Sequence, residues 1–421
     1  MRNLILAAAA LLFAASAHAA PQSQTWVPTW YAPPEPVADA PILLSNTTVR
    51  QIVHTTAGGK ILRLRLSNAF GATELHIDKA AVALRGDGSA IAPGTDTAVT
   101  FAGQAGATIP PGAFVLSDPV AFDVPEQGDL AVSYFVSGPA PVFTVHLQQR
   151  NAVYYAAGDV TDAETLTPVP SPSNNDWTPW LSQVEVAQSP ETATVVAFGD
   201  SITDGAGPKA DSNASWPDDL YGRFRDAGIP LSLTNAAISG NRLLHNGQWA
   251  PFGSDGLARF DADVLAQPNV RAVIVLIGIN DIGHPGAGSP MSETTPPEEM
   301  EAGLSQLAMR AHEHGLKIYI GTLTPFRDTV FKGYYSDDKE TQRQAVNAWI
   351  RHNGVFDGYA DFDKALDDPA NPGHLRPDFD SGDHLHPSAA GDTAIADAIP
   401  LGWFATDTPK PTARKRKHRR H

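Results

Sequence analysis

The chain has 421 residues, of which 42% are hydrophobic and 18% are charged, so it can build a sizeable core and has too few charges for a disordered chain. Its formal net charge of −16 argues against a body that grips nucleic-acid phosphates. The sequence has no cysteine, which excludes disulfides, thiolate zinc sites, iron–sulfur clusters and a cysteine nucleophile. At about 150 residues per domain, this length predicts two or three domains.

The first 19 residues have the pattern of a secretory signal peptide. Arg2 is followed by an apolar run over residues 4–15 and by an Ala-x-Ala site at residues 17–19. This run is shorter than the ~20 residues that span a bilayer, and no later segment is long and apolar enough to do so. We therefore expect cleavage after Ala19, no transmembrane segment, and a secreted or periplasmic protein.

Residues 22–186 predict a β-rich domain. Apolar and basic side chains alternate over residues 61–66, as on a half-buried strand, and residues 75–77 and 130–135 have similar patterns. Clusters of proline and glycine separate these runs, and no long 3.6-residue period is present. The pattern favours an antiparallel β-sandwich of jelly-roll-like type, with a proline-rich linker at residues 165–175.

Five aromatic residues at the two ends of this region leave two interpretations open. Aromatic rings stack on sugars, so the region is a candidate glycan-binding module in its own right. The interpretation that we favour is that these rings seal the contact with the second domain. The residues are Trp26, Trp30, Tyr31, Trp177 and Trp180.

The pattern changes over residues 193–406, where short β-branched runs alternate with helical stretches. This alternation predicts βαβ units around a parallel sheet. We expect strands at residues 194–198, 231–234, 272–277, 317–322 and 359–362, and the clearest helices at residues 297–314 and 339–352.

Four short polar clusters lie where such a sheet places its ligands, at the carboxyl ends of strands. The first three follow successive strands, and the fourth precedes the final helix. They are Gly199-Asp200-Ser201, the turn at Gly240, Gly278-Ile279-Asn280-Asp281 and Asp383-His384-Leu385-His386.

These clusters contain the parts of a serine hydrolase site. A serine hydroxyl is a poor nucleophile unless a base takes its proton and a third group orients that base. His386 and Asp383 lie three positions apart and supply both roles for Ser201. The backbone N–H groups of Ser201 and Gly240 and the side-chain amide of Asn280 are candidate donors to the oxyanion of a tetrahedral intermediate.

On these residues, the region resembles the SGNH hydrolase superfamily, also called GDSL-type esterases and lipases. Together with its β-rich leading region, the chain is similar to secreted bacterial members. The resemblance implies a flavodoxin-like sheet of about five parallel strands, and hydrolysis of carboxylic esters with no metal and no organic cofactor. It also implies that Ser201 is the nucleophile, His386 the general base and Asp383 its orienting group, with an oxyanion hole of Ser201, Gly240 and Asn280.

Other polar residues near these clusters have simpler interpretations. His384, two positions before His386, invites a metal-site hypothesis, but without cysteine we disfavour it. Asp200 and Asp281 are expected to hold turns by accepting backbone N–H bonds. Arg242 either lines the cleft or joins loops.

Several aromatic residues in loops after the strands are candidates to shape an acyl or glycan pocket, and we expect at least one of them to do so. They are Phe252, Phe326, Phe331, Tyr334 and Tyr335.

The sequence thus predicts an exported serine esterase that works through an acyl-enzyme on a small-molecule or polysaccharide ester. A carbohydrate O-deacetylase or short-chain acyl esterase is the first hypothesis, and a lipase or lysophospholipase is the alternative. No Gly-x-Ser-x-Gly elbow surrounds a serine, and no nucleotide-binding glycine loop follows a strand. The basic tail at residues 407–421 is expected to be a disordered end, with weak attachment to an anionic envelope as the other possibility.

Overall fold

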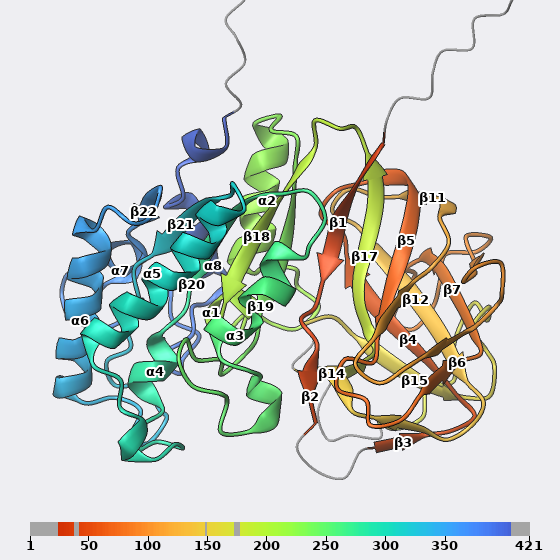
Figure 1. Cartoon of the computed structure of the whole chain (residues 1–421), viewed down its shortest axis with the longest axis horizontal. Helices are drawn as coiled ribbons and strands as arrows, with labels where there is room; N and C mark the ends of the chain where they lie inside the picture. Colours follow the sequence, from red (N-terminus) through yellow and green to blue (C-terminus); the bar gives the residue numbers. More distant parts are fainter. Residues whose placement is uncertain (1–23, 38–41, 148–149, 172–176, 406–421) are drawn as a thin grey trace, which may run out of the picture.

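The computed structural model describes residues 24–37, 42–147, 150–171 and 177–405. Two halves lie side by side in Figure 1, a β-rich half (residues 24–188) and an α/β half (residues 193–405). The predicted signal peptide, the basic tail and part of the proline-rich linker lie outside the described residues. The domain boundaries themselves stay a prediction.

The β-rich half contains two five-stranded sheets, and all of their pairings are antiparallel. One has the order β1-β17-β5-β10 with β11 also on β5, and the other has the order β15-β4-β12-β7-β8. No helix occurs among the described residues of this half. The predicted β-rich region is therefore confirmed, and its jelly-roll-like arrangement stays a prediction.

The strands of this half are β1 (Thr25–Tyr31), β2 (Glu35–Pro36), β3 (Ile42–Leu44), β4 (Thr47–His54), β5 (Gly59–Ser67), β6 (Leu75–Ile77), β7 (Lys79–Leu84), β8 (Thr97–Val99), β9 (Ala107–Ile109), β10 (Phe114–Leu116), β11 (Val120–Val124), β12 (Asp129–Val136), β13 (Ala140–Val142), β14 (Thr144–His146), β15 (Val153–Ala157), β16 (Thr178–Pro179) and β17 (Leu181–Gln188).

Strand β5 has one buried face and one partly exposed face, as the alternation of its apolar and basic residues predicted. Leu62, Leu64 and Leu66 are fully buried, whereas Arg63 and Arg65 between them keep part of their side chains in solvent. Successive side chains of a strand point to opposite faces, so one face of β5 enters the core and the other carries charge.

The α/β half is built on a five-stranded parallel sheet of order β19-β18-β20-β21-β22. In chain order this is 2-1-3-4-5, the flavodoxin-like arrangement, and helices cover both faces of the sheet (Figure 1). The strands are β18 (Ala193–Gly199), β19 (Leu231–Ala237), β20 (Val270–Leu276), β21 (Lys317–Gly321) and β22 (Gly358–Ala360). The expected parallel sheet is confirmed.

The helices of this half follow the strands. They are α1 (Ser201–Asp204), α2 (Trp216–Asp226), α3 (Gly256–Phe260), α4 (Ile279–Gly283), α5 (Pro297–Glu313), α6 (Asp337–His352), α7 (Phe362–Leu366) and α8 (Ala389–Asp397), with short helical turns at η1 (Ala250–Phe252), η2 (Asp261–Leu265), η3 (Met291–Glu293) and η4 (Leu401–Phe404).

The carboxyl ends of two strands differ from the predicted ones by two or more residues, and those of the other three differ by one. β19 continues to Ala237, because its pairing with β18 extends to the Gly199–Ala237 pair. β22 ends at Ala360, because Asp361 caps α7 by accepting from the backbone N–H of Lys364.

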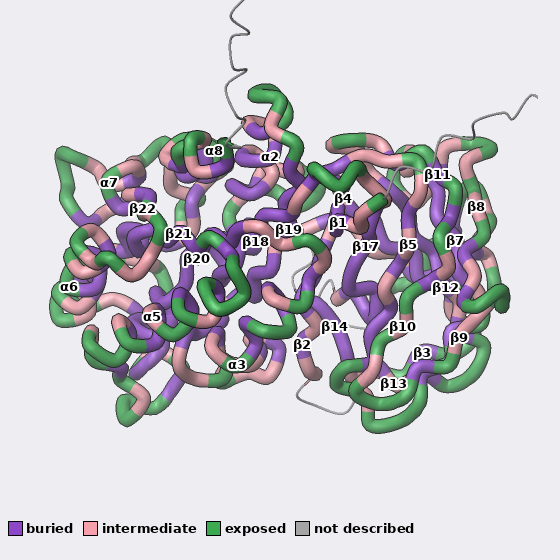
Figure 2. Tube along the Cα trace, turned by 45° about the horizontal axis from the view of Figure 1, so that its top comes forward, coloured by how far each residue is buried: buried purple, intermediate pink, exposed green. Residues whose placement is uncertain are grey.

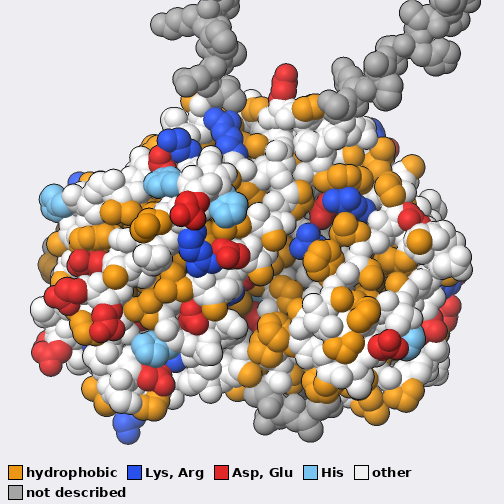
Figure 3. Space-filling view, in the orientation of Figure 1, with side chains coloured by type: hydrophobic (Ala, Val, Ile, Leu, Met, Phe, Trp, Pro, Cys, Tyr) orange, Lys and Arg blue, Asp and Glu red, His pale blue; other side chains and the backbone are white. Residues whose placement is uncertain are grey.

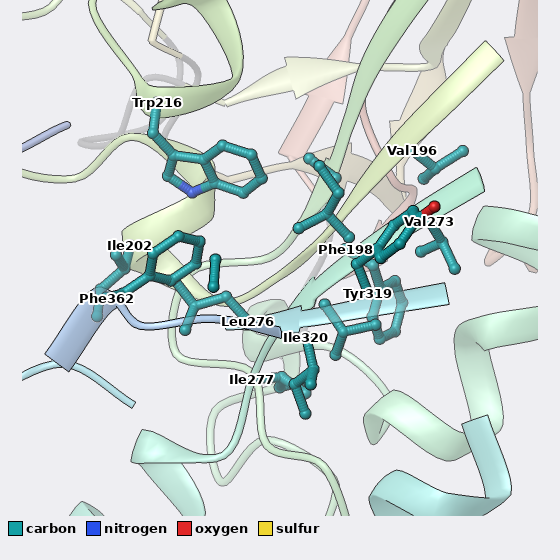
Figure 4. Close-up of a cluster of buried hydrophobic side chains, with 14 of the residues drawn as sticks. Val196, Phe198, Ile202, Trp216, Val273, Leu276, Ile277, Tyr319, Ile320 and Phe362 are labelled. Atoms are coloured by element: carbon teal, nitrogen blue, oxygen red, sulfur yellow. The ribbon is translucent and has the colours of Figure 1, made fainter. Parts of the chain in front are cut away.

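Each half has its own main cluster of buried apolar side chains. Buried residues, drawn in purple, run through both halves in Figure 2. In the α/β half, Ile202 of α1 lies beside Phe362, and the Trp216 ring packs near both (Figure 4). The centroids of the Trp216 and Phe362 rings are 6.3 Å apart. The short helix α1 is therefore anchored on its inner side.

Charged side chains of both signs are interspersed over the face of the molecule seen in Figure 3. None of the helices in the described part of the chain combines the length and the apolar character that a membrane crossing requires.

Candidate active site

The candidate site begins at the sharp turn between β18 and α1. A Cβ atom on Gly199 would lie 2.3 Å from Thr203 Oγ1 and 2.5 Å from the Leu276 carbonyl oxygen, so this position accepts only glycine. The Asp200 side chain accepts from the Ile202 N–H at 3.1 Å and caps the helix. Ser201 is the first residue of α1 and is 7% exposed.

Ser201, His386 and Asp383 lie in one hydrogen-bonded row. Ser201 Oγ is 2.8 Å from His386 Nε2, and His386 Nδ1 is 2.6 Å from Asp383 Oδ2. The other Asp383 oxygen accepts the backbone N–H groups of Leu385 at 2.9 Å and His386 at 2.8 Å. The structure thus brings together the three residues that the sequence selected for the triad.

The surroundings of Asp383 keep its carboxylate ionised. Partial burial opposes the charge, but the hydrogen bond and charge of His386 and the two backbone N–H groups outweigh it, and the pKa of Asp383 falls to about 2. An ionised Asp383 accepts a hydrogen bond from the Nδ1–H group of His386, so His386 Nε2 is left as an acceptor toward Ser201.

The Gly240 turn and Asn280 are joined to each other. Gly240 has φ +78°, a conformation that favours glycine. Asn280 Nδ2 donates to the carbonyl of Asn241 at 2.9 Å, and its Oδ1 accepts from the Tyr334 hydroxyl at 2.7 Å. These two bonds fix the orientation of the Asn280 amide.

Strand register places these donors beside Ser201. In the sheet, Gly199 pairs with Ala237 on one side and with Leu276 on the other, so the loops that carry Gly240 and Asn280 flank the Ser201 loop. Among the described residues, the backbone N–H groups of Ser201 and Gly240 have no protein acceptor. Unused donors at the edge of a site are available for a developing negative charge.

The side chains of Asp200 and Asp281 accept hydrogen bonds from backbone N–H groups of turns, as we expected from the sequence. Asp281 accepts from the N–H groups of Leu243 at 2.7 Å and Leu244 at 3.0 Å. Burial raises the pKa of Asp200 to about 7 and that of Asp281 to about 6, with backbone hydrogen bonds opposing the shift in both.

Arg242 joins loops and does not line a cleft. Its side chain is 2% exposed and forms an ion pair with Glu293 at 2.7 Å, and it also donates to the Asn246 carbonyl. His384 is half exposed and pairs with Asp380. Among the described residues, no cluster of three or more His, Cys, Asp or Glu side chains has the arrangement of a metal site.

Aromatic side chains surround the site. A Cβ on Gly240 would lie 2.5 Å from the Phe252 ring, so Phe252 packs directly on this turn. Phe331 is 43% exposed, and its ring makes an edge contact with His386 at 6.1 Å between centroids. Phe326, in contrast, is fully buried behind Tyr334.

Arg259 is a residue of the site that sequence reasoning missed. Its guanidinium donates to the carbonyls of Gly199 and Ala236 at 2.7 Å each, and to Asn241 Oδ1 at 2.9 Å. It thereby ties together the ends of β18 and β19. The one signal in the sequence is the four-residue spacing from Asp263, with which Arg259 forms an ion pair at 3.0 Å.

Residues 197–394 match the model of the GDSL-like Lipase/Acylhydrolase family. Among solved structures, a GDSL-like lipase from Bacteroides thetaiotaomicron is similar, with 19% identity, a TM-score of 0.36 and coverage of 49% of this chain and 85% of that chain. A catalytic mutant of an acetylxylan esterase from Geobacillus stearothermophilus is similar with 22% identity, a TM-score of 0.39 and coverage of 51% and 95%, respectively. The chain has no match among curated proteins.

Proposed function

Because residues 197–394 belong to the GDSL-like lipase/acylhydrolase family and the protein is accordingly a carboxylic ester hydrolase, we propose that it is a serine esterase with Ser201 as its nucleophile. The observation that carries this proposal is the hydrogen-bonded row from Ser201 Oγ through His386 to Asp383, with contacts of 2.8 Å and 2.6 Å. Nucleophile, base and orienting group within hydrogen-bond reach are the arrangement that activates a serine.

In the proposed reaction, His386 Nε2 takes the proton of Ser201 as Oγ attacks the ester carbonyl. The tetrahedral intermediate collapses, the bond to the alcohol breaks, and His386 returns the proton to the departing alcohol. Water then attacks the acyl-enzyme with His386 again as base, and release of the acid restores Ser201. Asp383 holds the imidazole and stabilises its positive charge throughout.

The oxyanion of both tetrahedral intermediates is proposed to bind the N–H groups of Ser201 and Gly240 and the Asn280 amide. Two features support this: the unused N–H groups of Ser201 and Gly240, and the fixed orientation of Asn280 between Asn241 and Tyr334. Donors that are held in place before the reaction stabilise the transition state without reorganisation.

For the substrate, we propose a short acyl group, with a carbohydrate O-acetyl ester as the first choice. The Phe252 ring packs on Gly240 and the Tyr334 hydroxyl donates to Asn280, so aromatic side chains lie beside two of the proposed oxyanion donors. This supports a small acyl group such as acetyl over a long chain. The exposed Phe331 ring beside His386 offers a face on which a sugar alcohol stacks. A lipase or lysophospholipase is the alternative.

The first test compares hydrolysis of p-nitrophenyl acetate by the protein and by its Ser201→Ala variant. We expect the variant to lose turnover by about 10⁴-fold or more, because only the oxyanion donors and substrate binding remain. Its thermal unfolding should be unchanged. Turnover that survives in a folded variant would move the nucleophile elsewhere.

The second test concerns the acyl chain and the alcohol. We expect p-nitrophenyl acetate to be turned over faster than the dodecanoate, and acetate to be released from an acetylated oligosaccharide. Phe331→Ala should raise KM for the oligosaccharide and leave KM for p-nitrophenyl acetate nearly unchanged. A preference for dodecanoate, or for a lysophospholipid, would favour the alternative.

A glycan-binding role for the β-rich half receives less support. Tyr31 and Trp180 are buried, at 6% and 1% exposure, so their faces do not meet a sugar from solvent. Trp26 lies under the guanidinium of Arg63 at 4.3 Å. These contacts favour the interpretation in which the aromatic residues belong to the interior and to the junction of the two halves.

Export is also part of the proposal, from the signal-like first 19 residues. Expression of the full sequence in a bacterium should yield a mature protein outside the cytoplasm that begins at Ala20. Sequencing the N-terminus of the fractionated protein checks this, and an intact Met1 in the cytoplasm would contradict it.

A further inference from the structure

The two halves meet through a buried polar cluster beside α1. Asp204 is the last residue of α1 and is 6% exposed. Its carboxylate accepts from Ser239 Oγ at 2.5 Å and from Arg150 Nη2 at 3.1 Å. The same Arg150 nitrogen also donates to Ser239 Oγ at 3.0 Å. One guanidinium from the β-rich half thus holds two residues of the α/β half.

Both of those residues adjoin groups with a proposed catalytic role. Asp204 ends the one-turn helix that begins at Ser201, and Ser239 directly precedes Gly240. The Arg150 contacts therefore set the separation between the helix that carries the nucleophile and the turn that carries an oxyanion donor. Displacing reacting groups by about 1 Å costs up to a hundredfold in rate.

His146 and Glu35 complete the cluster from the same side. His146 Nε2 is 3.5 Å from Asp204 Oδ1, and His146 Nδ1 is 2.9 Å from Glu35 Oε1. All three side chains are almost fully buried. Burial opposes the charge of Asp204, but Arg150 and His146 outweigh it, so its pKa lies below the usual range. Two cations from the β-rich half therefore compensate a carboxylate at the end of α1.

A second connection reaches the same edge of the sheet. The Tyr31 hydroxyl donates to Asp263 Oδ1 at 2.7 Å, and Asp263 forms an ion pair with Arg259. Arg259 in turn holds the carbonyls of Gly199 and Ala236. The β-rich half thus contacts the supports of the site through two separate sets of hydrogen bonds.

We infer that the β-rich half is a positioning element of the esterase. Through its hydrogen bonds to Asp204 and Ser239, Arg150 keeps Ser201 and the N–H group of Gly240 at the separation that lets both act on one oxyanion. This inference rests on the proposed function of Ser201 and Gly240. It gives the β-rich half a role in catalysis without a contact to the substrate.

The test replaces Arg150 by Gln in the full-length protein and measures kcat and KM with p-nitrophenyl acetate. Active sites are first titrated with an organophosphate that labels Ser201, so that only folded molecules are counted. We expect kcat to fall tenfold to a hundredfold with KM changed less than threefold, and the affinity for a boronic acid transition-state analogue to fall by the same factor as kcat. Arg150→Lys should restore part of kcat, since it keeps one cationic donor.

Arg63→Gln is the matched control. Arg63 is also a partly exposed arginine paired with a buried carboxylate, that of Glu185 at 2.7 Å, but both residues lie within the β-rich half. We expect this variant to lose stability and keep the kcat of the unmodified protein. A merely structural Arg150 would behave in the same way.

The outcomes separate the inference from the proposed function. If Ser201→Ala retains turnover, the proposed function fails. If Ser201→Ala is inactive but Arg150→Gln has the same kcat per titrated site as Arg63→Gln, only the inference is overturned. If Arg150→Gln does not fold, Arg150→Lys decides: a lowered kcat and analogue affinity at unchanged melting temperature supports the inference, and unchanged values overturn it.

Discussion

The two halves of this molecule place polar side chains in different ways because their strands run differently. All five strands of the α/β half are parallel, so the loops after β18, β19 and β20 open at one edge and bring Ser201, Gly240 and Asn280 together. In the antiparallel sheets of the β-rich half, successive strand ends alternate between two edges. This half contributes to the site where it meets the α/β half, through His146 at the end of β14, Arg150 four residues later and Tyr31 at the end of β1.

A buried arginine shows the same contrast. Arg50 in the β-rich half is fully buried and donates to Ser133 Oγ and to the carbonyls of Thr161 and Ala163, so it fixes loops of its own half. Arg259 in the α/β half binds backbone carbonyls at the strand ends next to Ser201. The same side chain supports a fold in one place and a site in the other, and the topology around it decides which.

The largest expected effect is a loss of kcat, and it distinguishes two histidines of the same loop, His384 and His386. His386→Gln should lower kcat by about 10⁴-fold, because glutamine takes no proton from Ser201. His384→Gln should leave kcat within about twofold, since His384 pairs with Asp380 and is 47% exposed. Steady-state kinetics with p-nitrophenyl acetate measures both. Equal losses would mean that the loop as a whole, and not His386, carries the activity.

A smaller effect is expected at the oxyanion donors of the parallel edge. Asn280→Ala removes the amide held between Asn241 and Tyr334, and should lower kcat by about 10²- to 10³-fold with little change in KM. Asn353→Ala, at the end of α6, is the control and should keep full activity. A raised KM at unchanged kcat in Asn280→Ala would instead assign Asn280 to substrate binding.

Much of the parallel edge was predictable, because its signals are local. The first three polar clusters each follow an apolar run of strand length, and in the fourth, Asp383 and His386 share one turn. Arg259 was missed since its carbonyl partner at Gly199 lies 60 residues away, and nothing in the sequence indicates that pairing.

The junction between the halves was not predictable for the same physical reason. His146 and Arg150 belong to no motif, and their partner Asp204 lies more than 50 residues further on, in the other half. Which edge of an antiparallel sheet faces its neighbour depends on packing of the whole chain. Of the aromatic residues expected at this contact, Tyr31 packs in the core of the α/β half, whereas Trp180 packs in the core of the β-rich half. The hydrogen bond of Tyr31 to Asp263 had no signal in the sequence.

The smallest expected effect is on stability and comes from His146. Burial opposes its charged form, but Glu35 and Asp204 outweigh this and raise the pKa of His146 from its ordinary value of 6.5 to about 10. A group with a raised pKa in the folded state contributes stability that is fully present below pH 6.5 and is lost as pH rises through 10. The free energy of unfolding should therefore fall between pH 7 and pH 10, by no more than about 1.4 kcal/mol per pH unit for one proton.

Urea unfolding at pH 7, 8, 9 and 10 measures this slope. His146→Gln should be less stable than the unmodified protein at pH 7 and should show a flatter dependence, because it has no proton to lose. His76→Gln is the control, since His76 is exposed and hydrogen-bonded to Thr108, and it should keep the full slope. Parallel curves for the protein and for His146→Gln would mean that His146 is not charged at the junction, and that Arg150 alone compensates Asp204.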